Sequence, residues 1–113
     1  MLDLGNGHFV MYAHLQPGSL RVKLGEKVKS GQILALLGNT GNSDAPHLHF
    51  QMMDTNSPLG AEGIPYELRT FTQTGVIDDS DAIDAGKSWQ PKNPKVVKHE
   101  MEFPVDNAVV NFP

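Results

Sequence analysis

The sequence contains no cysteine, no apolar run long enough to cross a membrane and no run of lysine or arginine. Without cysteine there are no disulfides and no thiolate zinc sites, so any bound metal needs histidine or carboxylate ligands. No apolar run approaches the ~18 residues of a transmembrane helix. Nine Lys and Arg against 13 Asp and Glu give a net charge of −4. That balance argues against nucleic-acid binding.

The composition is typical of a turn-rich β protein rather than a helical bundle. Only 19% of the 113 residues are charged, while the chain contains 11 Gly and 8 Pro. This length suits one domain with a modest core. Residues 1–4 lack the basic start and the apolar length of a signal peptide. They already have strand character, so we expect the numbering to begin inside a fold whose N-terminal part is missing.

Apolar alternation and turn residues predict a mostly antiparallel, all-β fold. The turn Gly5-Asn6-Gly7 predicts a hairpin between residues 1–4 and 8–15. Alternation along 8–15 places His14 on the same face as His8, Val10 and Tyr12. The other expected strands are a buried central strand at 33–37, then 47–53, 66–74, 96–103 and 108–112.

The segment Pro46-His47-Leu48-His49-Phe50 carries two histidines one residue apart. On a strand, both imidazoles would lie on one face, with Leu48 and Phe50 on the other. Neutral imidazole is a common metal ligand and a common general base. Taken alone, the pair is compatible with a zinc site, with activation of a water molecule, or with a solvated polar face.

Further segments in a fixed order make the pattern more specific. They are Gly5-Asn6-Gly7, Tyr12-Ala13-His14-Leu15, Leu24-Gly25…Val28…Gly31-Gln32-Ile33, Gly38-Asn39-Thr40-Gly41-Asn42-Ser43 and Pro46-His47-Leu48-His49-Phe50. Together they closely resemble the lysostaphin-type zinc metallopeptidases, the bacterial peptidoglycan endopeptidases with a LytM-like catalytic domain. The resemblance spans residues 2–54. A weaker likeness to the tails of some family members covers the remainder.

The resemblance implies a role for each of three histidines. His49 corresponds to the zinc ligand, while His47 and His14 correspond to catalytic histidines that do not bind the metal. In such enzymes zinc polarises the scissile carbonyl and lowers the pKa of a bound water toward ~7. The two other imidazoles take the proton of that water and stabilise the oxyanion. Tyr12 is expected to pack rather than to react.

The resemblance also implies two further zinc ligands, a histidine and an aspartate from an earlier H-x-x-x-D segment. No such segment occurs in residues 1–113. Neither Asp3 nor His99-Glu100 has the right position to replace it. We therefore expect a single peptidase-like domain over 1–113, with a catalytic β core at 1–54 and a C-terminal β extension at 55–113. Lacking two ligands, this chain alone should bind Zn²⁺ weakly or not at all. An upstream segment, a separate chain or a second copy could complete the site.

The resemblance predicts zinc-dependent hydrolysis of peptide bonds in peptidoglycan, within the stem peptide or the cross-bridge. It also predicts a periplasmic, cell-wall or secreted location. One alternative is a non-catalytic family member that binds peptidoglycan or regulates a partner. A second is a biotinyl or lipoyl carrier, for which the turn Gly38–Gly41 lacks the acceptor lysine.

Three other features are interpreted as structural. The loop 38–46 lacks the Gly-Lys-Ser/Thr ending of a phosphate-binding loop, and we expect its backbone to pass close to a ligand or a neighbouring strand. The acidic cluster of Asp78, Asp79, Asp81 and Asp84 lacks the pattern of a calcium-binding loop. His8 is expected to be solvated or at the edge of a groove.

Overall fold

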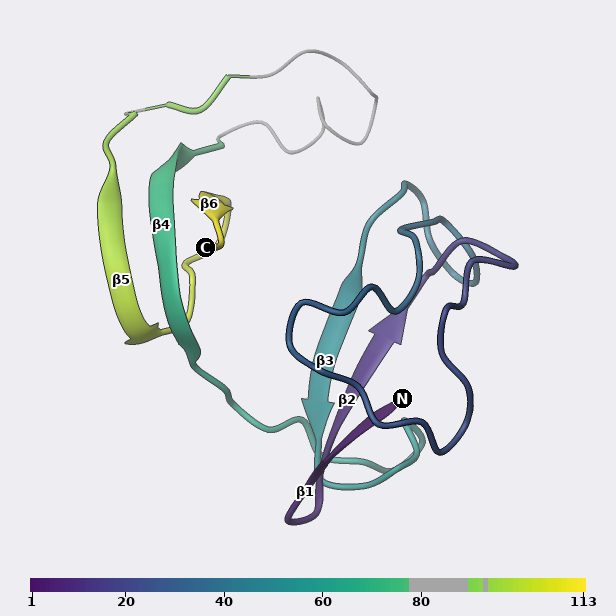
Figure 1. Cartoon of the computed structure of the whole chain (residues 1–113). Coiled ribbons are helices and arrows are strands. Elements are labelled where there is room, and N and C mark those ends of the chain that lie inside the picture. Colours follow the sequence, from purple (N-terminus) through teal and green to yellow (C-terminus); the bar gives the residue numbers. More distant parts are fainter. Residues whose placement is uncertain (78–89, 93) are drawn as a thin grey trace. The chain divides into compact units, whose positions relative to one another are not determined.

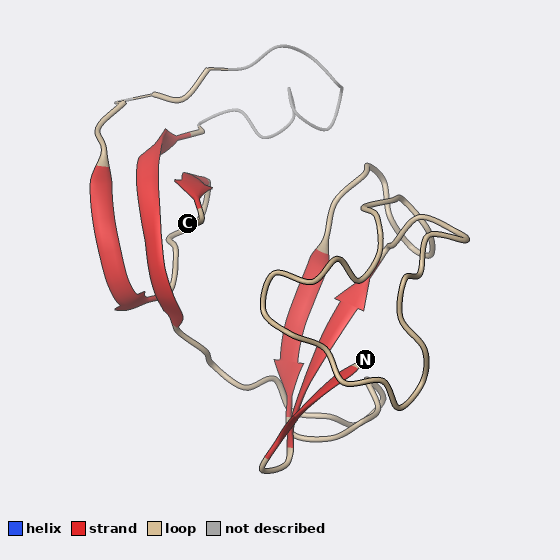
Figure 2. Cartoon of the chain, in the orientation of Figure 1, coloured by secondary structure: helices blue, strands red, loops and turns tan. Residues whose placement is uncertain are grey.

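A computed structural model describes residues 1–77, 90–92 and 94–113 (Figure 1). These residues form six strands and no helix, in two three-stranded antiparallel sheets (Figure 2). The predicted all-β fold is confirmed. The strands are β1 (Leu2–Gly5), β2 (His8–Ala13), β3 (His49–Met53), β4 (Leu68–Val76), β5 (Val97–Glu102) and β6 (Ala108–Asn111).

The chain divides into two compact units, Met1–Ile64 and Pro65–Pro113. The first contains the sheet β1-β2-β3 and the second contains the sheet β5-β4-β6. The division into a core of 1–54 and an extension of 55–113 stays a prediction. No helix in the part of the chain that the structure describes is long and apolar enough to cross a membrane.

The hairpin between β1 and β2 turns at Asn6 and Gly7, as expected. Both residues have positive φ, 56° and 75°, which the two-residue turn favoured in hairpins requires. The register shifts between Asp3 and Gly5. There Asp3 Oδ1 accepts a hydrogen bond of 2.8 Å from the amide of Gly5, so this carboxylate stabilises the turn.

The pairing of β2 with β3 positions the histidine region. The register runs from Phe9 opposite Met53 to Ala13 opposite His49. Val10 and Met53 are the buried hydrophobic residues of this unit, at 3% and 0% exposure. Both strands are shorter than predicted, since β2 ends at Ala13 and β3 begins at His49. His14, Leu15, His47 and Leu48 therefore lie outside the regular strands.

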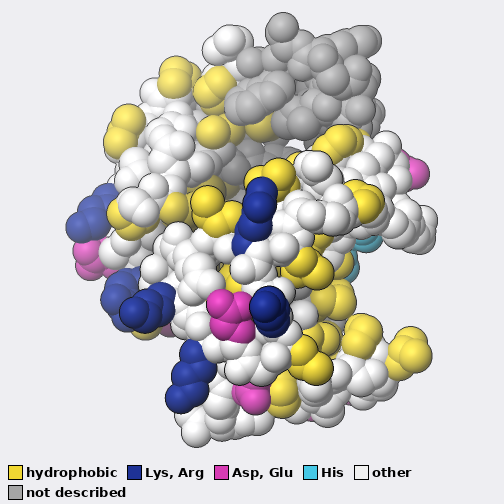
Figure 3. Space-filling model, turned by 45° about the vertical axis from the view of Figure 1, so that its right-hand side comes forward, with side chains coloured by type: hydrophobic (Ala, Val, Ile, Leu, Met, Phe, Trp, Pro, Cys, Tyr) yellow, Lys and Arg dark blue, Asp and Glu magenta, His cyan; other side chains and the backbone are white. Residues whose placement is uncertain are grey.

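The prediction of a buried strand at residues 33–37 is wrong. Ile33 and Leu37 are 67% and 56% exposed, and Figure 3 shows hydrophobic side chains open to solvent on the molecular surface. In the described structure the segment is held by separate backbone bonds, from Arg21 N to Leu34 O and from Gln16 N to Leu36 O, both 2.8 Å. The apolar run lacks a neighbouring strand that would pair along its length, so it forms neither a strand nor a core.

The loop that follows does pass close to neighbouring backbone, as predicted. A Cβ atom added at Gly38 would lie 2.5 Å from Gln16 N and 2.6 Å from Gln16 Cα. Contacts this short leave no room for a side chain. Gly38 thus lets the loop 38–46 lie against the segment that continues from β2.

The second sheet agrees with the predicted strands to within two residues at each end. Phe71, in the central strand β4, is 2% exposed and pairs with His99 of β5. The two rings stack with centroids 4.9 Å apart and planes 10° apart. The acidic cluster of residues 78, 79, 81 and 84 lies outside the described residues.

Candidate active site

Three histidines come together where β2 ends and β3 begins. The ring centroid of His14 lies 4.6 Å from that of His47 and 5.8 Å from that of His49. The rings of His14 and His47 are tilted by 42°. His14 is partly buried, whereas His47 and His49 are exposed. The structure therefore joins all three histidines that the sequence analysis singled out.

The backbone conformation of His14 explains how its ring reaches the other two. Ala13 pairs with His49 and therefore shares its face of the sheet. Regular alternation would place the next residue, His14, on the opposite face. His14 instead has φ of 64°, a left-handed conformation that costs about 1–2 kcal/mol in a residue with a Cβ. The bend ends β2 and redirects the side chain.

The predicted shared face of His14 and Tyr12 is therefore wrong, although the predicted grouping of the histidines is right. Tyr12 pairs with Phe50, and the two rings meet edge to face with centroids 5.2 Å apart. Burial raises the pKa of Tyr12 above its ordinary value of 10.0. Tyr12 packs, as the sequence analysis expected.

The loop 38–46 holds the ring of His14. The Nδ1 atom of His14 lies 2.6 Å from the carbonyl oxygen of Thr40. The Thr40 hydroxyl donates a hydrogen bond of 2.8 Å to the carbonyl of Leu15. Thr40 is thus bonded both to the His14 ring and to the next residue along the chain.

The same loop holds the ring of His47. Its Nδ1 lies 2.7 Å from the carbonyl oxygen of Ala45 and 3.1 Å from Ser43 Oγ. The Ser43 hydroxyl also lies 2.9 Å from that carbonyl. The side-chain amide of Asn39 donates to Ser43 Oγ at 2.5 Å and to Ala45 O at 3.0 Å. A small polar network therefore surrounds one nitrogen of His47.

His49 differs from the other two histidines because its hydrogen bond is made through Nε2. This atom lies 3.1 Å from Oε1 of Gln51, two residues further along β3. Within the described residues the Nδ1 of His49 makes no hydrogen bond, which leaves this nitrogen as the candidate metal donor. The exposed ring is accessible to an ion from solvent.

The described residues do not form a complete metal site. Zinc in a catalytic site normally has three protein ligands and one water. No group of three or more His, Cys, Asp or Glu residues within 1–77, 90–92 and 94–113 could hold a metal ion. The donor set near His49 therefore fits only part of what zinc requires.

The other ionisable candidates belong to other structural elements. His8 is exposed at the opposite end of β2, about 17 Å from Ala13 along the strand. Asp3 is used by the turn. His99 belongs to the second sheet, where Nδ1 lies 2.5 Å from Glu102 Oε2. None of these groups is brought to the three histidines by the pairing of β1, β2 and β3.

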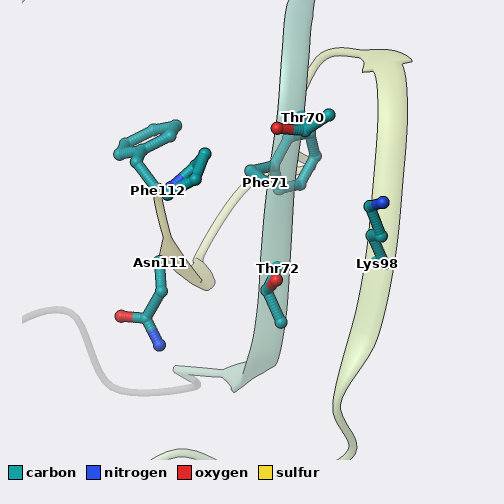
Figure 4. A pocket seen from close by; sticks show the side chains of 7 residues that line it. Thr70, Phe71, Thr72, Lys98, Asn111 and Phe112 are labelled. Atoms are coloured by element: carbon teal, nitrogen blue, oxygen red, sulfur yellow. The ribbon is translucent and has the colours of Figure 1, made fainter.

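The second unit contains a shallow hollow of about 160 Å³. Figure 4 shows its lining, which consists of Thr70, Phe71, Thr72, Lys98, Asn111, Phe112 and Pro113. The one charged group, Lys98, lies 3.0 Å from the carboxylate of Glu100. Among the described residues, the lining contains no histidine, aspartate or glutamate.

Sequence reasoning missed the roles of Asn39, Thr40 and Ser43. The available signal was the concentration of small hydrogen-bonding residues immediately before His47. It predicted a close backbone approach, but composition does not reveal which carbonyl faces which imidazole. That information depends on the folded path of the loop.

Comparisons with known proteins place these residues in a family. The model of Peptidase family M23 matches residues 1–61, more than half of the 113 residues. The matched range lies within the first compact unit and includes all three grouped histidines. No solved structure gives a significant match.

Three similar proteins show how far the likeness extends. Glycyl-glycine endopeptidase ALE-1 of Staphylococcus capitis is 54% identical over 50 residues, 44% of this chain and 13% of that protein. Peptidoglycan DD-endopeptidase ShyA of Vibrio cholerae is 40% identical over 61 residues, 54% of this chain and 14% of that protein. Lysostaphin of Staphylococcus simulans is 52% identical over 46 residues, 41% of this chain and 9% of that protein. The chain thus matches only 9–14% of the length of these relatives. On the evidence of the family match and of the grouped histidines within it, the chain belongs to peptidase family M23.

Proposed function

We propose that this chain carries part of the active site of a zinc-dependent endopeptidase that cleaves peptide bonds in peptidoglycan. The observation that supports this most strongly is the approach of His14 to His47 and His49, at 4.6 and 5.8 Å between ring centroids. The names of the relatives, a glycyl-glycine endopeptidase and a peptidoglycan DD-endopeptidase, support the class of substrate. The bond cleaved would lie in the stem peptide or the cross-bridge.

In this proposal the three histidines divide the chemistry. His49 is a zinc ligand, while His14 and His47 are the catalytic residues. Their Nδ1 atoms face backbone carbonyls, which leaves Nε2 of each ring for water or substrate. One imidazole takes a proton from the attacking water and the other stabilises the oxyanion. Zinc, when bound to a complete ligand set, would polarise the scissile carbonyl.

The remaining zinc ligands would come from an upstream segment of the same protein, from a separate chain or from a second copy of this chain. The residues 1–54 would act as the catalytic core and 55–113 as its extension. Because the proposed substrate is cell-wall peptide, the complete protein would work in the periplasm, in the wall or outside the cell. A zinc titration of the isolated chain tests whether zinc ligands are missing from it. Tight one-to-one binding of zinc by the monomer would contradict the proposal.

The central experiment replaces His47 with Ala in the complete protein and measures hydrolysis of purified peptidoglycan. Loss of a general acid or base should lower kcat by about 10²- to 10⁴-fold. His8→Ala is the matched control, because His8 is an exposed histidine on the adjoining strand β2. Full activity in the H47A protein would disprove the catalytic role of His47.

A second candidate function is non-catalytic binding of peptidoglycan or regulation of a partner. The absence of a three-ligand metal group within the described residues favours it. Under this alternative the complete protein would sediment with peptidoglycan but release no peptide fragments, with or without added zinc. Zinc-dependent release of fragments would exclude the alternative.

A further inference from the structure

We propose that Thr40 and Ser43 are positioning residues that hold His14 and His47 in one tautomer, with the proton on Nδ1 and a lone pair on Nε2. The catalytic value of this arrangement rests on the proposed function, because it assigns the two rings to proton transfer. The tautomers themselves follow from the hydrogen bonds and can be measured without any substrate.

The carbonyl groups around the two rings determine the tautomers. A carbonyl oxygen only accepts hydrogen bonds, so an imidazole nitrogen that bonds to it must carry the proton. His14 Nδ1 lies 2.6 Å from Thr40 O, and His47 Nδ1 lies 2.7 Å from Ala45 O. In a neutral imidazole the other nitrogen is then an acceptor. Both Nε2 atoms are therefore proton acceptors, as a general base requires.

Thr40 positions His14 through two bonds. Its carbonyl accepts a hydrogen bond from the His14 ring, and its hydroxyl donates a hydrogen bond of 2.8 Å to the carbonyl of Leu15. Since Leu15 directly follows His14, the hydroxyl secures the main chain beside a residue with φ of 64°. Removing the hydroxyl should allow the bend to relax and the carbonyl of Thr40 to move away from Nδ1.

Ser43 positions His47 through the carbonyl of Ala45. The Ser43 hydroxyl lies 2.9 Å from that oxygen and 3.1 Å from Nδ1 of His47. With its hydrogen directed to the carbonyl, the hydroxyl presents a lone pair to the Nδ1 proton. An unprotonated Nδ1 would instead face the Ala45 oxygen at 2.7 Å, where two lone pairs repel. The network therefore favours the proton on Nδ1.

Two-bond ¹H–¹⁵N correlation spectra of the ¹⁵N-labelled 113-residue chain test the proposal directly. At about pH 8.5, well above the ordinary imidazole pKa of ~6.5, the spectra distinguish the two neutral tautomers. We expect the Nδ1–H form to dominate for His14 and His47. Thr40→Val keeps the shape but removes the hydroxyl, and should lower the Nδ1–H to Nε2–H ratio of His14 by two- to tenfold, the equivalent of a hydrogen bond.

Three further variants isolate each contact. Thr40→Ser keeps the hydroxyl and should keep the Nδ1–H to Nε2–H ratio of His14 at its wild-type value. Ser43→Ala should lower the His47 ratio by about two- to tenfold while leaving His14 unchanged. Ser30→Ala removes an exposed hydroxyl in the same unit and should change neither ring. In the complete protein, T40V should lower kcat by about tenfold or more at constant KM, whereas T40S should retain it.

The proposal is overturned if either ring of the wild-type chain carries its proton mainly on Nε2. It is also overturned if T40V and S43A keep wild-type ratios in well-dispersed spectra. If a variant fails to fold, the tautomers of His14 and His47 in the wild-type chain still test the proposal. The expected tautomers in a protein that cannot hydrolyse peptidoglycan would refute the proposed function alone. Hydrolysis by a protein with Nε2–H rings would refute the positioning roles alone.

Discussion

The two units of this chain use histidine in opposite ways. In the unit Met1–Ile64, His14 and His47 lie beyond the ends of strands, where backbone carbonyls bond to one nitrogen and leave the other available. In the unit Pro65–Pro113, His99 lies within β5, stacked on Phe71 and bonded to Glu102. In β5 the imidazole of His99 serves packing and pairing. A strand end can keep one nitrogen free for chemistry.

Each unit has a small buried core and exposes other large apolar residues. The second is built around Phe71, 2% exposed in the middle of a nine-residue strand. The first buries Val10 and Met53 but leaves Leu24 and Ile33 open to solvent. The second also exposes Val96, Met101 and Phe103. The first unit devotes more of its chain to loops, one of which holds the histidines.

The largest expected effect separates the two kinds of histidine. In the complete protein, His14→Ala should lower kcat for peptidoglycan hydrolysis by about 10²- to 10⁴-fold, because it removes a proton-transfer group. His99→Ala should leave kcat within about twofold, because the proposed function gives His99 no part in the proton transfer. Hydrolysis assays on both variants at equal concentration make the comparison. A larger loss in H99A than in H14A would reverse our assignment of the two units.

The next effect concerns the buried residues. Phe71→Ala should destabilise the second unit by about 3–5 kcal/mol, as expected for a buried phenylalanine. Amide hydrogen exchange of the 113-residue chain should show faster exchange in β4, β5 and β6. Leu24→Ala provides the control, because this side chain is already fully exposed in the structure. Equal effects of the two substitutions would contradict the burial of Phe71.

A smaller effect is expected at the closest approach of the histidine loop. Gly38→Ala places a Cβ 2.5 Å from Gln16 N, and the resulting shift should destabilise the first unit by about 1–3 kcal/mol. Gly63→Ala is the matched control, since its Cβ would have no neighbour within 4 Å. Denaturant unfolding of both variants measures the difference. The close approach would be disproved if G38A were as stable as G63A.

The smallest expected effect is a loss of folding stability at alkaline pH, to which one tyrosine in each unit contributes. Burial raises the pKa of Tyr12 and of Tyr66 above the ordinary value of 10.0. The unfolded chain therefore loses these protons at lower pH than the folded chain. Their contribution to stability is fully present below pH ~10 and decreases as pH rises through the higher folded-state pKa. Tyr12→Phe and Tyr66→Phe should each make the decrease in melting temperature between pH 9 and 11 slightly shallower.

Much of the fold was predictable from local patterns. Asn6-Gly7 predicted the first hairpin because both residues readily adopt positive φ. Alternation predicted β4, β5 and β6 to within two residues, since period-two burial is a local property of a strand. The ordered segments through His49 predicted the family, and with it the set of histidines. These features depend on residues close together in the sequence.

The geometry of the site depended on contacts between distant segments. The bend at His14 is stabilised by Thr40, 26 residues away, and no local rule anticipates a left-handed histidine at that point. The run at 33–37 was apolar enough for a core strand, yet burial also requires a neighbouring strand along its length. The ordered segments alone thus single out the three histidines. The folded path of the loop 38–46 determines which nitrogen His14 and His47 present, because their hydrogen bonds to the carbonyls of Thr40 and Ala45 hold the proton on Nδ1.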